Sequence, residues 1–263
     1  MTRTISKSMA GILEELELEN DAVIDMQRLS YLAQKHNVKT EPAVIASRLR
    51  KAGWLLPTSQ RGVWEFSPAA MAGAFSKNDP LLTVIAYMKA NPDTECFLCM
   101  QTAAWALGLA DRIPSRREVA FISKPAAVPQ ELTAFHYEPV LDPVTVKGVP
   151  CLTPESIIVH IASKPVQIRS WESAMEWIPD VVYEIGIENL FTELSAKNDS
   201  VKRRTGYLLE GMYPEAAEAI AGIVSNSSKI RFGPRTKACR NNEKWKISDT
   251  ILPFDPIELG RVK

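Results

Sequence analysis

Three short helical patterns and two aromatic-rich strands follow one another within residues 1–66, and few small folds place these elements so close together in this order. A helix, a helix, a helix and a hairpin in succession are typical of a winged helix-turn-helix. The sequence therefore predicts such a domain over residues 1–69. The helices are expected at residues 5–19, 25–37 and 40–52, and the two strands of the hairpin at 54–56 and 63–66, joined by a turn with Pro57, Arg61 and Gly62.

The first two helical patterns are amphipathic. Acidic residues fill the polar face of the first pattern, so this helix is expected to face water as an outer support. Asp25 is expected as the N-cap of the second helix, because its carboxylate can accept a hydrogen bond from a backbone N–H of the first turn. The apolar stripes consist of Met9, Ile12, Leu13 and Leu16 in the first helix and of Met26, Leu29, Leu32 and Ala33 in the second, and the acids are Glu14, Glu15, Glu17 and Glu19.

The third helical pattern has the layout of a recognition helix. Thr40 is expected as its N-cap, and Gly53 is expected to end it. Ile45, Leu49 and Ala52 form its buried stripe, which turns the basic residues toward solvent. The residues expected to contact DNA are Thr40, Ser47, Arg48, Arg50 and Lys51 on this helix and Arg61 in the wing, with Ser47 and Arg48 at base edges and Arg50, Lys51 and Arg61 at phosphates.

Charge is distributed unevenly along a chain whose formal net charge is zero. Residues 39–61 carry five basic side chains and one acidic side chain, whereas residues 14–25 carry six acids and no base. DNA phosphates would therefore meet the third helix and the wing, and the first helix would face away. A winged helix can also serve as a protein interaction module without a nucleic-acid partner, and this alternative stays open.

Four segments carry a resemblance to a known family. They are LRKAGWLLPTSQRGVWEFSP, QTAAWALGLADRIPSRREVAFISK, CLTPESIIVHIAS and SVKRRTGYLLEGMYP. In this order they resemble the wing, the small-residue helix with its following strand, the Ser-Pro-Glu-like helix start and the Arg-Arg-x-Gly-Tyr helix of the AbiEi antitoxins, which belong to bacterial abortive-infection (type IV) toxin-antitoxin systems. The chain departs from that pattern at Cys99, Cys151 and Thr153, where the family has serine or other small residues.

The resemblance implies an α+β fold, with the winged helix followed by a mixed α/β antitoxin domain over residues 70–263. It also implies a non-enzymatic antitoxin that binds inverted repeats in double-stranded operator DNA and represses its own operon. The partner would be a nucleotidyltransferase-like toxin, counteracted by contact or through a shared target. A direct protein-protein inhibitor of the toxin, without operator specificity, is the alternative.

Periodicity alone predicts helices and strands for the second domain, together with a β-like C-terminal segment that contains Trp245. The helices are expected at 80–91, 98–109, 154–163, 168–178, 186–195, 200–210 and 214–225, and the strands near 117–123, 133–138 and 144–152.

Cys96 and Cys99 form a CxxC pair, which raises the question of a metal or redox site. No second pair and no HxxxH motif occurs in the sequence, so a zinc site would have to recruit scattered side chains. The surrounding CFLCMQTAAWALGL is apolar, and the two cysteines are therefore expected to pack as small hydrophobic residues at the start of a buried helix. No metal, no cofactor and no catalytic residue is predicted.

A metal-dependent nuclease is the strongest enzymatic alternative. LDPVTVKG places Asp142 five residues before Lys147 on a predicted strand, but the second carboxylate that such a site needs is missing from the segment. GxSxG and Walker-type GxxxxGKS/T motifs do not occur, nor do the Gly-Ser and paired aspartates of a nucleotidyltransferase.

A second basic segment covers residues 197–246, with eleven basic and five acidic side chains. An acidic stretch over residues 67–196, with nine basic and fifteen acidic side chains, separates it from the first. A second DNA contact, an RNA contact or the docking of an acidic partner would all use such a composition. The residues expected at this surface are Lys202, Arg203, Arg204, Lys229, Arg231, Arg235, Lys237 and Arg240.

The N-terminal sequence lacks the uninterrupted apolar stretch of a secretory signal, and no run of apolar residues approaches the ~20 that cross a bilayer. A cytoplasmic location is therefore expected, where the four cysteines would stay reduced.

Overall fold

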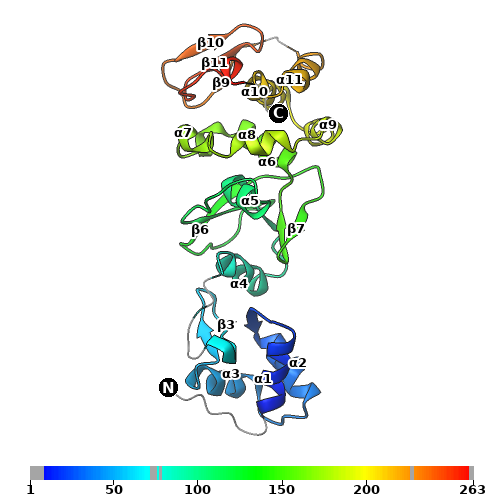
Figure 1. Ribbon diagram of the computed structural model, residues 1–263, viewed down its shortest axis with the longest axis vertical. Helices are drawn as coiled ribbons and strands as arrows, with labels where there is room; N and C mark the ends of the chain where they lie inside the picture. Colours follow the sequence, from blue (N-terminus) through cyan, green and yellow to red (C-terminus); the bar gives the residue numbers. More distant parts are fainter. Residues whose placement is uncertain (1–8, 72–75, 77–78, 226–227, 261–263) are drawn as a thin grey trace. The chain divides into compact units, whose positions relative to one another are not determined.

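The computed structural model describes residues 9–71, 76, 79–225 and 228–260, which fall into two compact units. Both units contain helices and strands, so the chain has the predicted α+β class (Figure 1). Within the described residues, no helix is long and apolar enough to span a membrane. The first unit comprises Met1–Glu95 with Pro125–Leu132, and the second comprises Cys96–Lys124 with Thr133–Lys263.

The first unit has the element order of a winged helix-turn-helix, as predicted. Its three strands form an antiparallel sheet in the order β1-β3-β2. The strand β1 is not predicted by the sequence, because three residues are too few to show a period and its pairing with β3 is a tertiary contact. The elements are α1 (Ala10–Leu18), β1 (Val23–Asp25), α2 (Met26–Lys35), α3 (Pro42–Lys51), β2 (Leu55–Pro57), β3 (Val63–Phe66), the 3-10 turn η2 (Ala69–Met71) and α4 (Leu82–Ala90).

The core of this unit is built from the predicted apolar stripes. Trp54 and Phe66 stack beside them with ring centroids 6.4 Å apart. Met26 departs from the prediction: it stands at the first position of α2, where its side chain is 37% exposed. The fully buried side chains that hold the three helices together are Ile12, Leu16, Leu29, Leu32, Ile45 and Leu49.

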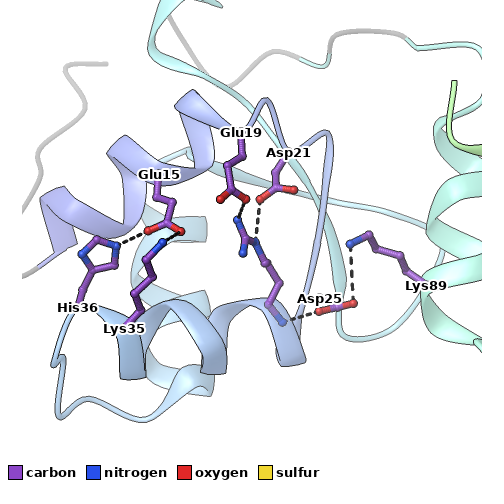
Figure 2. Close-up of polar contacts among 8 residues, drawn as sticks. Glu15, Glu19, Asp21, Asp25, Lys35, His36 and Lys89 are labelled. Atoms are coloured by element: carbon purple, nitrogen blue, oxygen red, sulfur yellow. Dashed lines mark hydrogen bonds and ion pairs between the residues drawn. The ribbon is translucent and has the colours of Figure 1, made fainter.

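Ion pairs join α1 to α2 (Figure 2). Glu15 was expected to face water but is buried, with its carboxylate oxygens 2.6 Å from Lys35 Nζ and 2.7 Å from His36 Nε2. The hydrogen bond from Lys35 lowers the pKa of Glu15. Arg28 pairs in the same way with Asp21 and Glu19. Glu15, Glu19 and Asp21 are therefore neutralised locally by Lys35 and Arg28 of the second helix.

The N-cap of α2 is Asp25, as predicted, because its Oδ1 accepts a hydrogen bond of 2.7 Å from the backbone N–H of Arg28. Figure 2 also shows Lys89 directed toward Asp25. Lys89 belongs to α4, whose Ala86 packs with Val23 and Val63 in a small apolar cluster. The first unit thus extends to Glu95, beyond the winged-helix motif for which residue 69 is the predicted end.

The second unit contains a five-stranded sheet in the order β6-β5-β4-β8-β7. The central strand β4 pairs antiparallel with β5 and parallel with β8. The sheet therefore contains both parallel and antiparallel strand pairs. The elements that make and flank the sheet are β4 (Cys96–Leu98), α5 (Met100–Ala106), β5 (Arg117–Phe121), β6 (Leu132–His136), β7 (Val144–Val146) and β8 (Val149–Cys151).

Three predictions for this unit were wrong in detail. Leu98 lies in β4, although it was expected in the helix over 98–109, which begins only at Met100. The strand expected over 144–152 is a hairpin, since Lys147 and Gly148 both have positive φ and reverse the chain. The helix expected over 168–178 is divided, because Pro179 fits only the first turn of a new helix.

Helices and a second, small sheet make up the rest of this unit (Figure 1). The sheet has the order β10-β11-β9, with β9 and β11 parallel. The elements are α6 (Pro154–Ser163), η3 (Pro165–Gln167), α7 (Trp171–Ala174), α8 (Ile178–Tyr183), α9 (Ile187–Ser195), α10 (Asp199–Leu209), α11 (Pro214–Ala221), β9 (Ile230–Phe232), β10 (Arg240–Asn242), β11 (Ile247–Asp249) and η4 (Pro256–Glu258).

Helix α6 is the central helix of this unit, with eight consecutive residues buried. It begins at residue 154, as predicted. Thr153 is the N-cap and accepts a hydrogen bond from the backbone N–H of Ser156, and Pro154 opens the first turn. Near its end, His160 is fully buried and stacks on Tyr137, with the ring centroids 4.4 Å apart.

Burial of His160 makes the stability of the second unit depend on pH. Desolvation, aided by the positive charges of Lys164 and Lys197 and by His136, lowers the pKa of His160 to about 3, and a contact with Gln167 opposes this shift in part. Since the unfolded chain, with a pKa near 6.5, takes up the proton first, stability is complete above pH 6.5 and falls as the pH drops toward 3. We expect a loss of about 2 kcal/mol between pH 7 and pH 5 from this group.

Urea unfolding at the two pH values measures this loss. The matched control is His160→Phe, which keeps a ring of similar size against Tyr137 but does not titrate. The free energy of unfolding of the variant should fall less between pH 7 and pH 5 than that of the wild type. Equal losses in both proteins would show that His160 is not responsible.

Candidate nucleic-acid interface

A groove lies between α3, the predicted recognition helix, and the wing, which is the β2–β3 hairpin. Side chains from one face of α3 line one wall, and the wing lines the other. No carboxylate lines it within the part of the chain that the structure describes, whereas two arginines do. The lining residues are Met26, Ala43, Ala46, Ser47, Arg50, Pro57, Thr58, Gln60, Arg61, Gly62, Val63 and Trp64.

The start of α3 differs by one residue from the prediction. The N-cap is Glu41, without a side-chain cap hydrogen bond, and Pro42 takes the first helical position. Thr40 therefore lies outside the helix and is half-buried. Pro42 fixes the backbone for the first turn and lacks the N–H that would be unpaired there, which explains why the helix begins at this point.

The end of α3 agrees with the prediction. Gly53 has φ +78°, a left-handed conformation that favours glycine, and its N–H donates to Arg50 O at 3.0 Å. The next N–H, that of Trp54, donates to Leu49 O at 2.9 Å. This C-cap turns the chain directly into β2 and so sets the wing beside the helix.

Hydrogen bonds within its turn shape the wing. The hydroxyl of Thr58 donates to Val63 O at 2.8 Å and accepts from the backbone N–H of Gln60 at 3.1 Å. Gly62, with φ +79°, completes the reversal. Arg61 is held at the exposed end of this turn, where its guanidinium can reach a phosphate.

The structure brings together some of the residues predicted to contact DNA. Ser47, Arg50 and Arg61 line the groove, whereas Arg48 and Lys51 are exposed on α3 outside its lining. Successive residues of an α-helix lie about 100° apart around its axis, so Arg48 does not share with Ser47 the face that is directed at the wing. The face toward the wing therefore belongs to Ser47 and Arg50, and the predicted role of Arg48 at base edges stays a prediction.

Sequence reasoning missed several residues of the groove, above all Met26, Gln60 and Trp64. Met26 was assigned to the core because the period of α2 places it on the apolar stripe. Trp64 alternates along β3 with the buried Val63 and Glu65, so strand period 2 could have indicated its outward direction. For Gln60 no sequence signal exists, because its position depends on the turn.

Three residues of the Arg-Arg-x-Gly-Tyr motif of α10, namely Arg203, Gly206 and Tyr207, make structural contacts with the C-terminal segment. Arg203 was predicted at a surface but is buried, because its guanidinium donates to Trp245 O at 2.8 Å and to Lys246 O at 2.9 Å. Gly206 lies against the indole of Trp245, and Tyr207 donates to Asp249 Oδ2 at 3.0 Å. The motif thus fastens α10 to the C-terminal sheet.

Arg240 also departs from the predicted surface. Its Nη1 donates to Asp249 Oδ2 at 2.8 Å, and its Nε lies 3.4 Å from Asp255 Oδ2. These pairs neutralise the charge of Arg240, so it serves the fold of the small sheet. Lys237, Arg231 and Arg235 are exposed, as predicted.

The cysteines of the CxxC pair are buried, together with Cys151. Burial raises the pKa of Cys96 to about 11 and that of Cys99 well above its ordinary value, so both thiols stay protonated at neutral pH. This confirms the prediction that they pack as hydrophobic residues. Among the described residues, no three or more His, Cys, Asp or Glu side chains are grouped so that they could hold a metal ion.

The geometry of the nuclease alternative differs from the prediction. Lys147 lies in the β7–β8 turn and not on a strand, and its Nζ is 5.3 Å from the centroid of the Trp105 ring. A lysine engaged with an aromatic face is not directed at a pair of metal-binding carboxylates.

The fold and the groove define a winged-helix protein with a second, mixed α/β domain. Residues 97–211 match the model of the AbiEi antitoxin C-terminal domain, the family that the motifs predicted. The match supports an antitoxin role. No protein of curated function matches the chain in sequence.

A solved structure shares the fold over almost the whole chain. The crystal structure of the Rv2827c protein from Mycobacterium tuberculosis aligns with a TM-score of 0.73 at 21% sequence identity, covering 97% of this chain and 95% of that chain. The matched family region runs from β4 to just beyond α10, and the small C-terminal sheet follows it.

Proposed function

We propose that the protein is an antitoxin that binds inverted repeats in its operator DNA through the groove between α3 and the wing, and so represses its own operon. The observation that carries the proposal is this groove, lined by Arg50 and Arg61 without a carboxylate. Arginine forks match phosphate oxygens, and a helix of this kind enters the major groove while a wing reaches the adjacent backbone.

Ion pairs at the acidic residues near α1 support DNA binding on the α3 side of the first unit. Glu15, Glu19 and Asp21 are paired with cations of α2, so they repel a polyanion less than their number suggests. The described residues of α3 and of the wing turn carry only basic charges beyond the N-cap Glu41. The α3 side of the first unit is therefore the side that attracts DNA phosphates most strongly.

We assign the counteraction of a nucleotidyltransferase-like toxin to the second unit. The match to the antitoxin domain falls there and does not include the winged helix. The chain would act on the toxin by contact or through a shared target. The protein is proposed to be non-enzymatic and to work in the cytoplasm.

Arg50→Ala combined with Arg61→Ala should weaken operator binding and reduce its salt dependence. Loss of two phosphate contacts lowers the slope of log K against log salt by about 2. The matched control is Lys124→Ala with Lys202→Ala, which removes the same charge outside the groove lining and breaks no ion pair of the described residues. Mobility-shift titration at several salt concentrations, on operator and on unrelated DNA, measures both effects. Equal loss in the two double variants, or equal affinity for unrelated DNA at every salt concentration, would contradict operator recognition by the groove.

The same variants separate the two activities. When toxin and antitoxin are expressed from foreign promoters, the groove variant should rescue cells as well as the wild type does, because its second unit is unchanged. Failure of a folded groove variant to rescue would place neutralisation in the winged helix. Rescue by a chain that binds DNA without specificity would favour the alternative of a direct protein-protein inhibitor.

A further inference from the structure

A second pocket lies in the C-terminal unit, where the side of α10 meets β9 and β11. Four of its lining residues are basic: Arg204, Lys229, Arg231 and Arg235. The others are Ile230, Gly233 and Ser248. No acidic residue belongs to this lining in the described chain, so four cations converge on one concave surface.

Arg204 is the fixed member of the set. Its Nε donates to Arg231 O at 2.7 Å and its Nη1 to Ser163 O at 3.2 Å, which holds the guanidinium between α6 and β9. Burial lowers the pKa of Arg204, and the neighbouring Arg203 lowers it further. Within the described residues its charge meets backbone carbonyls and other cations and forms no ion pair, an arrangement that an added anion would stabilise.

The pairing pattern of the basic segment distinguishes these cations from their neighbours. Arg240 pairs with Asp249, Lys244 with Glu210 and Lys246 with Glu243. Among the described residues, no such pair forms at the three other basic residues of the pocket, which are Lys229, Arg231 and Arg235. The segment thus pairs the charges that serve its fold, whereas in the described chain Arg204, Arg231 and Arg235 form no ion pair and Lys229 interacts with Glu243 only at longer range.

We propose that this pocket binds a chain of phosphate groups, as carried by a free nucleoside polyphosphate or by the 5′ end of an RNA strand. Guanidinium groups donate paired hydrogen bonds to phosphate oxygens, and several converging cations favour a ligand with several adjacent negative charges. A concave site lined by seven residues suits the end of a phosphate chain better than a duplex, because a duplex requires cations that are spread along a groove. The site shares no residue with the α3 groove and does not depend on operator binding.

Inorganic tripolyphosphate, titrated calorimetrically into the full chain, tests the pocket directly. Arg231→Ala with Arg235→Ala should weaken binding at least about tenfold, because each arginine loses charged hydrogen bonds. The matched control is Lys202→Ala with Lys237→Ala, which removes the same charge from the same segment outside the lining. At ~0.15 M salt, where exposed charges are screened beyond about 8 Å, this control should bind nearly as the wild type does. Thermal melts verify that both variants are folded.

Competition by a 5′-triphosphorylated RNA and by a nucleoside triphosphate then identifies the source of the phosphate chain, and displacement of tripolyphosphate by either supports the site. Equal weakening in the two double variants would show general electrostatic attraction and overturn the proposal, as would no binding at about 1 mM. Mobility shifts on operator DNA should be unchanged in Arg231→Ala with Arg235→Ala, so a failure of this proposal is distinguishable from a failure of the α3 groove.

Discussion

Gly206→Ala is expected to destabilise the second unit by about 3 kcal/mol or more. A Cβ at this position would lie within 3.0 Å of three atoms of the Trp245 indole. Trp245 is itself fully buried, so the ring cannot yield without displacing its neighbours. Alanine would gain about 1 kcal/mol of helix propensity, and this gain is too small to offset the overlap.

Gly222→Ala is the matched control. Gly222 ends α11 with an ordinary φ of −69°, and an added Cβ would meet only backbone oxygens at 3.4 Å and 4.0 Å. Its melting temperature should stay near that of the wild type, while that of Gly206→Ala should fall by roughly 6 to 12 °C. An unchanged melt for Gly206→Ala would show that the contact between α10 and the C-terminal sheet is looser than the structure indicates.

Glu193→Ala is expected to cost about 3 to 5 kcal/mol, because Glu193 is a fully buried carboxylate at the centre of a hydrogen-bond network. Its Oε2 accepts from the backbone N–H groups of Val140 and Leu141, at 3.0 Å and 2.9 Å, and from Ser156 Oγ at 2.8 Å. Its Oε1 accepts from the hydroxyl of Tyr137. Removal of the carboxylate leaves the buried hydroxyls of Tyr137 and Ser156, and two part-buried backbone N–H groups, without this acceptor.

Two variants on α9 serve as comparisons. Glu193→Gln keeps one oxygen and the shape of the side chain and should therefore lose less than Glu193→Ala. Glu188→Ala removes an exposed carboxylate from the first turn and should cost at most about 1 kcal/mol. Chemical denaturation of the three proteins at pH 7 gives the free energies of unfolding, and a loss for Glu193→Ala no larger than that for Glu188→Ala would contradict a central role of the network.

The parts of the fold that sequence predicts are those set by neighbours along the chain. The boundaries of α6 follow from Thr153, Pro154 and the apolar run behind them, and Gly53 ends α3 as its backbone requires. Arg203 and Glu15 could not be placed in the same way. Both look like solvated charges in the sequence, and their burial depends on partners 42 and 20 residues away.

The candidate groove was predicted to a similar extent. The period of α3 identifies Ser47 and Arg50, because the buried stripe fixes which positions turn outward. Gln60 lines the groove because of the path of the wing turn, and Met26 lines it because the start of α2 lies near α3 and the wing. No local sequence pattern encodes either arrangement. Tertiary structure thus determines which of the many basic residues line the same groove.

The fastening of α10 to the C-terminal sheet has a consequence for synthesis on the ribosome. Arg203, Gly206 and Tyr207 find their partners only when Trp245 and Asp249 have been made, close to the end of the chain. The core of the winged helix is complete in sequence by Phe66. At ~5–20 residues per second, translation of the roughly 180 intervening residues takes about 10 to 40 s. During this interval a nascent chain has the residues for the winged-helix core while its second unit still awaits its last strands.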